Sequence, residues 1–263
     1  RMHLAILAHG EGHEIASHAV GHFNGKTWSP SQWAKEFRAF NLLLRNVFTH
    51  NRFTPQEASA HAWKFRIRDI IGFRAPHLGH RLRRLWPVLK QFGYRYDTSA
   101  IRSKPMWPRK VRGIWRIPMA NVQVAGTRSW IAASDYLFKV INDKKVPRKC
   151  RDVRCYNKLR TLEDQVYDSY MRYFQIAYNR HRIPVNFGHH FSLWHHGIYW
   201  RALKRFMMSV CRLKEVRCVS FKELVTALEK VPPARYQAWR KRQFAPVSPR
   251  FRHNFTYGFP RRR

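Results

Sequence analysis

GHEIASHAVGH, at residues 12–22, is the first of four short stretches that together decide the fold of this chain. It is followed by IIGFRAPH at 70–77, GYRYDTS at 93–99 and GHHFSLW at 188–194. Each of the last three lies in or next to a run of β-branched or aromatic residues, which is typical of buried strands. Strand and helix patterns alternate between them, and this alternation indicates an α/β architecture.

The first stretch places His18 and His22 four residues apart. In a helical turn that spacing puts both imidazoles on one face, where they could chelate a divalent metal. It is not the His-Glu-x-x-His motif of zinc proteases. In a chain with 15 histidines, the pair could equally be two ordinary surface or core residues.

The other stretches place polar groups after predicted strands. Arg74 follows a strand predicted over 70–73, and His189 and His190 follow one predicted over 183–187. Ligands of α/β proteins bind at the carboxyl ends of strands, so these side chains are candidates for a cleft. A histidine there could serve as a general acid. The alternatives are a basic surface residue for Arg74 and hydrogen-bonded structural histidines for the other two.

In order and spacing, these stretches resemble the polysaccharide deacetylase family of the nodulation-protein type, over roughly residues 4–228. The resemblance implies that His18 and His22 are metal ligands, with Ala19 where the family has Ser or Thr. It implies that Arg74, in its Arg-x-Pro motif, orients the catalytic base. The general acid then falls on His190, with His189 as the other candidate. The implied fold is an irregular (β/α) barrel with fewer than eight strands, with all four side chains in one cleft.

The chain departs from the family at a decisive place. The resemblance implies a first strand with an Asp-Asp pair, of which one Asp is the general base and the other the third metal ligand. None of the seven aspartates precedes His22, and no Asp-Asp pair occurs. Two histidines alone hold a metal poorly, because catalytic zinc sites usually have three protein ligands. We therefore expect no cofactor, unless the missing carboxylate comes from a longer precursor or a neighbouring chain.

Charge is the second distinctive property of the sequence. Its 51 lysines and arginines exceed its 15 acids by 36, and arginine dominates. Such a domain repels itself unless a polyanion neutralises it, and arginine suits bidentate phosphate contacts. The charge favours nucleic acid as a partner. The alternative is a secreted basic enzyme that binds an acidic wall polymer.

Two segments concentrate this charge. Residues 144–160 are expected to form an exposed basic loop, and residues 231–263 a basic tail rich in proline and aromatic residues. We expect the tail to be extended and held by a partner outside its own domain, the alternative being a disordered tail. The predicted domains are therefore 1–230 and 231–263. The candidate RNA-binding residues are Lys144, Lys145, Arg148, Lys149, Arg151, Arg154, Arg160, Arg240, Lys241, Arg242, Arg250, Arg252, Arg261, Arg262 and Arg263.

The cysteines and the local patterns add further expectations. Four cysteines in a chain of this length are too few for a disulfide scaffold, so we expect free thiols. No apolar run has the length of a membrane span. Helices are expected to begin after Ser29, Thr54, Thr161 and Ser220, with others over 82–93 and 199–213, and a strand is expected over 216–219.

Three functions fit these observations to different extents. A non-catalytic deacetylase-like domain that binds RNA, as part of a large ribonucleoprotein such as an organellar ribosome, accounts for both the charge and the missing aspartates. The alternative is an active, metal-dependent polysaccharide N-deacetylase, which accounts for the retained histidines and Arg74. A glycan-binding domain without chemistry is the third. The first implies RNA and neighbouring proteins as partners and an organellar, for example mitochondrial, location; the second implies a secreted or periplasmic one.

Overall fold

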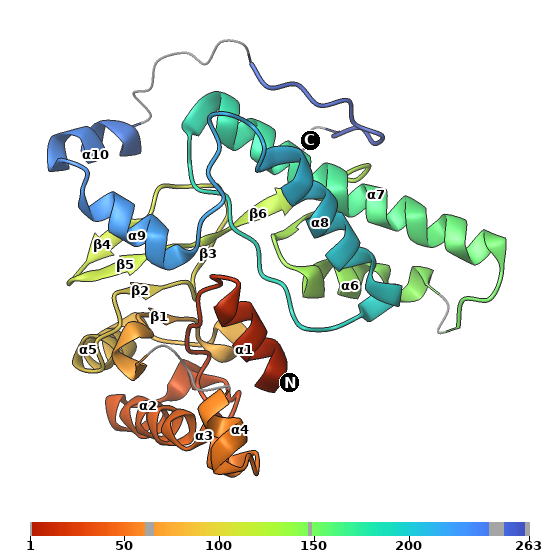
Figure 1. The fold of residues 1–263 in the computed structure, drawn as a ribbon. Coiled ribbons are helices and arrows are strands. Elements are labelled where there is room, and N and C mark those ends of the chain that lie inside the picture. Colours follow the sequence, from red (N-terminus) through yellow and green to blue (C-terminus); the bar gives the residue numbers. More distant parts are fainter. Residues whose placement is uncertain (1, 61–65, 147–148, 242–249, 261–263) are drawn as a thin grey trace. The chain divides into compact units, whose positions relative to one another are not determined.

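The structure is a computed structural model that describes residues 2–60, 66–146, 149–241 and 250–260 (Figure 1). The chain forms two compact units. Unit 1 comprises residues 1–100, 108–117 and 219–231, and unit 2 comprises residues 101–107, 118–218 and 232–263. The boundary that the sequence suggests near residue 231 thus coincides with a change of unit, but both units are assembled from separate segments.

Unit 1 is built on a small, mainly parallel sheet with the strand order β1-β2-β5-β4. β1 (Gly72–Phe73), β2 (Tyr96–Asp97) and β5 (Ile114–Arg116) are parallel, and β4 (Arg109–Val111) pairs antiparallel with β5. The strand predicted over 70–73 is therefore present, although shorter than expected.

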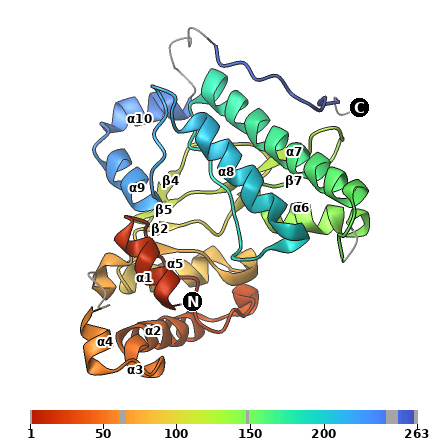
Figure 2. The same cartoon turned by 45° about the vertical axis from the view of Figure 1, so that its right-hand side comes forward.

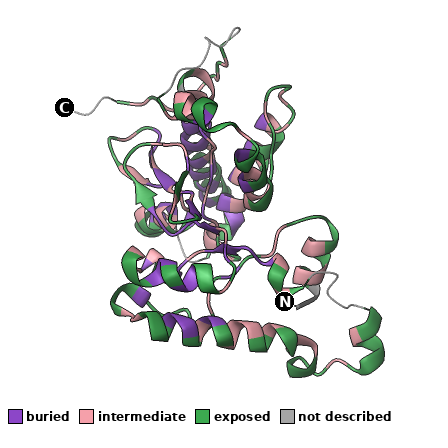
Figure 3. Ribbon diagram, turned by 90° about the vertical axis from the view of Figure 1, so that its left-hand side faces the viewer, coloured by how far each residue is buried: buried purple, intermediate pink, exposed green. Residues whose placement is uncertain are grey.

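Helix α2 (Pro30–Arg45) covers this sheet together with α5 (Leu82–Gln91). α2 begins as predicted, because Gln32 N donates to Ser29 Oγ while Ser29 N donates to Gln32 Oε1. Its buried face presents Trp33 and Phe37, which contact Phe73 of β1 edge to face. α2 and α5 are buried on one side and exposed on the other (Figure 3). Further elements of unit 1 are α1 (Met2–Gly10), η1 (Gly25–Thr27), α3 (Val47–His50), α4 (Pro55–Ala60), η2 (Ile67–Asp69), η3 (Pro76–Leu78) and α9 (Phe221–Glu229).

Unit 2 has a three-stranded sheet with the order β3-β6-β7. β3 (Ile101–Arg102) is parallel to β6 (Met119–Gln123), which pairs antiparallel with β7 (Trp130–Ala132). The long helix α7 (Val153–Ile176) packs on β6 and on α8 (Ile198–Val210). The two helices lie side by side in Figures 1 and 2. Further elements are α6 (Asp135–Asn142), η4 (Asp143–Lys145), η5 (Ala177–His181), η6 (Trp194–Gly197) and α10 (Pro233–Arg240).

Three local expectations for unit 2 are wrong. Thr161 does not begin a helix: α7 begins two turns earlier, where Asp152 accepts a hydrogen bond from Cys155 N, so the basic loop ends at residue 152. Thr161 instead donates to the carbonyl of Asn157 within the helix. Residues 183–187 and 216–219 form no strand, and near the first of these only Gly188 makes a β-bridge, to Ser134.

The carboxyl-terminal segment also differs from the expectation. Its first part is the helix α10, and the stretch 250–260 docks along α7 of its own unit (Figure 2). Phe251 and Phe255 pack against the core of unit 2, and Phe251 exchanges hydrogen bonds with the side chain of Asn179. Because apolar contacts and paired backbone groups fix this stretch, it belongs to the fold of unit 2.

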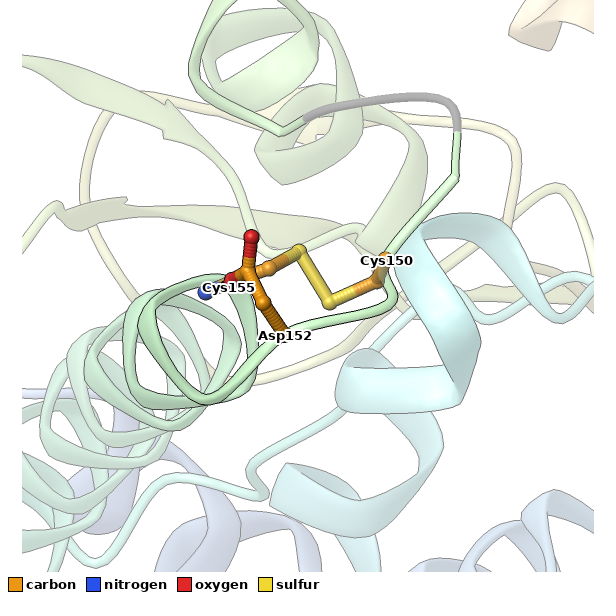
Figure 4. Close-up of a disulfide and its surroundings, with 3 residues drawn as sticks. All are labelled: Cys150, Asp152 and Cys155. Atoms are coloured by element: carbon orange, nitrogen blue, oxygen red, sulfur yellow. Dashed lines mark hydrogen bonds between the residues drawn. A yellow bond between two sulfur atoms is a disulfide. The ribbon is translucent and has the colours of Figure 1, made fainter.

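All four cysteines are in disulfides, which corrects the expectation of free thiols. Cys150 pairs with Cys155 and Cys211 with Cys218. The first bond ties the basic loop to the first turn of α7, beside the capping residue Asp152 (Figure 4). The second closes the segment that follows α8.

None of the helices in the described ranges is both long enough and apolar enough to cross a lipid bilayer.

Candidate functional site

Arg74 lies at the carboxyl end of β1 in unit 1. Its backbone nitrogen donates to Ser17 O, while Ser17 N donates to Gly72 O, so residue 17 lies alongside the strand. The guanidinium Nε of Arg74 donates to Thr98 Oγ1 just after β2, at 2.9 Å. The parallel pairing of β1 and β2 thus brings the two strand ends, and their polar side chains, to one edge.

The charge of Arg74 is only partly compensated. Burial lowers the pKa of Arg74, and the nearby carboxylate of Asp97 opposes that shift. Within the described residues, Arg74 Nη2 and Asp97 Oδ2 are buried without a hydrogen-bond partner. Buried polar atoms usually have partners, so this edge of the sheet holds unsatisfied groups of both signs.

His18, His22 and His77 form a cluster beside Arg74. His18 Nδ1 donates to the carbonyl of Arg74 at 2.7 Å, and the ring centroids of His18 and His22 are 5.2 Å apart. His77 Nε2 donates to the carbonyl of His22, with ring centroids 4.7 Å apart. The two predicted ligands are thus close, although not through a helical turn: Ala19 and His22 have φ values of 61° and 51°, which no α-helix contains.

The three histidines of this cluster are not arranged to share one metal ion. In the described residues, no group of three or more His, Cys, Asp or Glu side chains is arranged to hold a metal ion. A hydrogen bond from His18 Nδ1 to a carbonyl is the arrangement that orients a metal-binding imidazole, but in this structure His22 and His77 do not join His18 around a common ion position. We therefore derive no step through a metal.

A second polar group lies in unit 2, where α6 begins. The carboxylate of Asp135 accepts from His190 Nδ1 at 2.7 Å and from His190 N at 2.8 Å. The aspartate is buried, whereas half of the His190 side chain is exposed. This pair has the form of a general acid or base whose ring is oriented by a carboxylate, with Nε2 as the other ring nitrogen.

His189 is a buried structural residue. Its Nε2 lies 2.9 Å from the hydroxyl of Tyr170, and burial lowers its pKa to about 4, although Asp135 opposes that shift. The ring is therefore neutral at pH 7, so its 3.9 Å approach to Asp135 is not an ion pair. Of the two histidines, His190 is the one with the geometry of an acid–base group.

The structure thus groups His18, His22 and Arg74 in unit 1 and places His190 in unit 2. Convergence of all four on one cleft stays a prediction. Sequence reasoning missed Asp135 and His77. Asp135 follows β7 in the sequence Ala-Ser-Asp, and a carboxylate at the end of a strand was a usable signal; His77 belongs to the quoted stretch 70–77 but was not considered.

The candidate RNA-binding residues are mostly on the surface. Arg240 is half-buried, and Arg148, Arg242, Arg261, Arg262 and Arg263 lie outside the described residues. The exposed ones are Lys144, Lys145, Lys149, Arg151, Arg154, Arg160, Lys241, Arg250 and Arg252.

Comparison with known proteins supports the fold. The structure is similar to the crystal structure of a proposed polysaccharide deacetylase from Mycobacterium smegmatis, with a TM-score of 0.51 and 15% identity over 88% of this chain and 69% of that one. No protein-family model matches the chain, and no curated protein does. The chain therefore has a mixed α/β fold of the polysaccharide deacetylase kind.

Proposed function

We propose that this chain is a non-catalytic, deacetylase-like domain that binds RNA and serves as a structural component of a large ribonucleoprotein, such as the ribosome of a mitochondrion or another organelle. The observation that carries the proposal is the net charge. Even if each of the 15 acids neutralised one cation, 36 lysines and arginines would remain unmatched. A polyphosphate backbone matches that excess, whereas a neutral amino-sugar polymer does not.

The incomplete site in unit 1 supports the loss of catalysis. Deacetylation by the family's chemistry needs a carboxylate base beside the metal-bound water. In the part of the chain that the structure describes, the carboxylate beside Arg74 is that of Asp97, and one of its oxygens accepts from both the backbone nitrogen and the hydroxyl of Ser99. The resemblance implies that Arg74 orients this carboxylate base. Its Nη2 is buried without a hydrogen-bond partner, which fits an arginine whose carboxylate partner is missing.

The test is binding of the purified full chain to folded ribosomal RNA over a salt series. With six or more phosphates contacted, the affinity should fall by roughly 10³-fold or more between about 50 and 200 mM salt. A shallow salt dependence would overturn the proposal.

A matched pair of variants tests the location of the contacts. Replacing Lys144, Lys149, Arg151 and Arg154 by glutamine should reduce the salt slope by roughly one unit per contacting cation. The control replaces the same number of exposed cations in unit 1, namely Arg38, Arg81, Arg83 and Lys90. Equal losses in both variants would show that net charge alone, and not the basic loop, determines binding.

The oriented pair of Asp135 and His190 favours a second candidate, a metal-dependent polysaccharide N-deacetylase. We expect no release of acetate from N-acetylglucosamine oligomers, with or without added zinc or cobalt, because a base contributes roughly 10²–10⁴-fold to such a reaction. Acetate release that His190→Ala abolishes would establish the enzyme and displace the RNA-binding proposal.

A further inference from the structure

Unit 2 contains a hollow of about 720 Å³ between α7, α8 and the turn η6. This volume is within the range of sites for small ligands. Both helices contribute side chains that lie one or two turns apart. From α7 come Tyr156, Arg160, Glu163 and Asp164, and from α8 come Arg201 and Arg205. Residues with these spacings share one helix face, so both helices direct polar groups toward the hollow.

The carboxylates of this hollow lie beneath its arginines. Glu163 accepts from Arg201 Nε at 2.7 Å and from Arg205 Nη1 at 3.0 Å, and Arg205 also donates to Asp164 at 2.7 Å. The Glu163 side chain is 11% exposed, whereas those of Arg201 and Arg205 are 50% and 41% exposed. The positive groups therefore face the solvent, held in fixed orientations by the acids below.

The excess charge of the hollow is positive. Three arginines line it against two carboxylates. Within the described residues, the side chain of Arg160, which is exposed on α7, makes no hydrogen bond or ion pair. His196 adds an imidazole from the turn η6, where His195 and His196 have φ values of 49° and 58°. Arg201 Nη1 donates to the carbonyl of His196 at 2.6 Å, which holds this turn against α8.

An aromatic ring completes the hollow. Tyr156 lies one helical turn before Arg160, and 57% of it is exposed. An exposed tyrosine beside an unpaired arginine offers a stacking surface next to a phosphate-binding group, which is how proteins bind the unpaired bases of single-stranded nucleic acid.

We propose that this hollow binds a nucleotide, with its phosphate at Arg160, His196 and Arg201 and its base against Tyr156. The ligand chemistry is a phosphate joined to an aromatic base, either as a free nucleotide or as an unpaired residue of RNA. That the nucleotide belongs to RNA depends on the proposed function, whereas the nucleotide site itself does not depend on it.

The test is calorimetric titration of the full chain with adenosine 5′-monophosphate, adenosine and inorganic phosphate. Adenosine 5′-monophosphate should bind at least roughly tenfold more tightly than either fragment, because only it uses both the arginines and the ring. Arg160→Gln and Tyr156→Ala should each weaken its binding roughly tenfold, while Tyr156→Phe, which keeps the stacking surface, should bind as the parent chain does. Arg83→Gln, an exposed arginine of α5, is the matched control.

The outcomes separate the site from the general RNA proposal. Equal binding of inorganic phosphate and the nucleotide, or unchanged binding by Arg160→Gln and Tyr156→Ala, overturns the nucleotide site whatever the RNA result. A single-stranded uridine octamer provides the RNA arm. Weakened octamer binding by the two pocket variants supports RNA as the source, whereas weakened nucleotide binding with unchanged octamer binding assigns the site to a free nucleotide.

Discussion

His189 shows how one buried residue makes the stability of unit 2 depend on pH. Its pKa is about 4 in the folded chain, against about 6.5 in an unfolded one. Between pH 6.5 and 4, His189 is protonated in the unfolded chain but not in the folded chain, so protons favour the unfolded state. The contribution is therefore fully present above pH 6.5 and is lost as the pH falls toward 4.

We expect the free energy of unfolding to fall by roughly 3 kcal/mol between pH 6.5 and 4 on account of His189. Urea denaturation of the parent chain and of His189→Gln, measured at several pH values, checks this. The variant should be less stable at pH 7 but should depend less on pH over this interval. Parallel curves for the two chains would show that His189 is not the responsible group.

Individual site residues could be predicted where their motif lies within a few consecutive residues. His18, His22 and Arg74 were found because their motifs are local, and the structure does bring them together. The partner of His190 was not found, because Asp135 lies 55 residues away and nothing in either segment points to the other. The buried atoms of Arg74 and Asp97 that lack a hydrogen-bond partner could not be predicted either, because hydrogen bonding of buried groups depends on how distant segments pack.

Among the elements, helices with capping boxes were the most predictable. α2 and α9 begin after Ser29 and Ser220 as predicted, because a capping box is formed by residues within four consecutive positions. The start of α7 was missed, since the cluster of cations around Asp152 is typical of a loop and hid its capping role. The extended segment 183–187 was taken for a strand because apolar periodicity does not reveal whether a neighbouring strand is available for pairing.

The Cys150–Cys155 bond fixes the point where the basic loop meets α7, and its removal should be measurable. We expect a chain with both residues replaced by serine to lose about 2 kcal/mol of unfolding free energy, because a short loop is released in the unfolded state. Denaturation in urea checks this, with the Cys211→Ser, Cys218→Ser chain as the control for a bond of similar span. A thiol-reactive mass label on the denatured, unreduced parent chain should find no free cysteine; labelling of Cys150 or Cys155 would contradict the pairing.

For the whole molecule, the docked stretch 250–260 has the largest consequence. The buried carboxylate of Asp168 accepts from Tyr257 N at 2.9 Å and lies 3.3 Å from His253 Nε2. Removal of this stretch would leave a buried acid unpaired and uncover the core beneath Phe251 and Phe255.

We expect deletion of residues 250–263 to lower the unfolding free energy of unit 2 by at least about 3 kcal/mol. The loss comes from the apolar burial that is removed and from the buried carboxylate of Asp168, which is left without its hydrogen-bond partners. Hydrogen exchange along α7, together with urea denaturation, measures the loss. The control is the pair Arg250→Gln and Arg252→Gln, which removes two exposed cations but keeps the docked stretch. Unchanged protection of α7 in the truncated chain would show that the stretch is dispensable.

The composition predicted this stretch as part of an extended arm held by an outside partner, because it is rich in proline and basic residues. The phenylalanines that dock it, Phe251 and Phe255, lie four residues apart, but two apolar residues among many basic residues and prolines did not mark the stretch as part of a core. The division into two units was not predicted either, because each unit combines segments that are distant in the sequence.

The two disulfides also bear on how the chain is made. Four cysteines allow three pairings, and the observed one joins residues only five and seven positions apart. The other two pairings would close loops roughly tenfold longer, which costs each bond about 2 kcal/mol more in chain entropy. An unfolded nascent chain that meets an oxidant therefore forms the native bonds first. We therefore expect both native bonds to close early in oxidative refolding, ahead of the two other pairings.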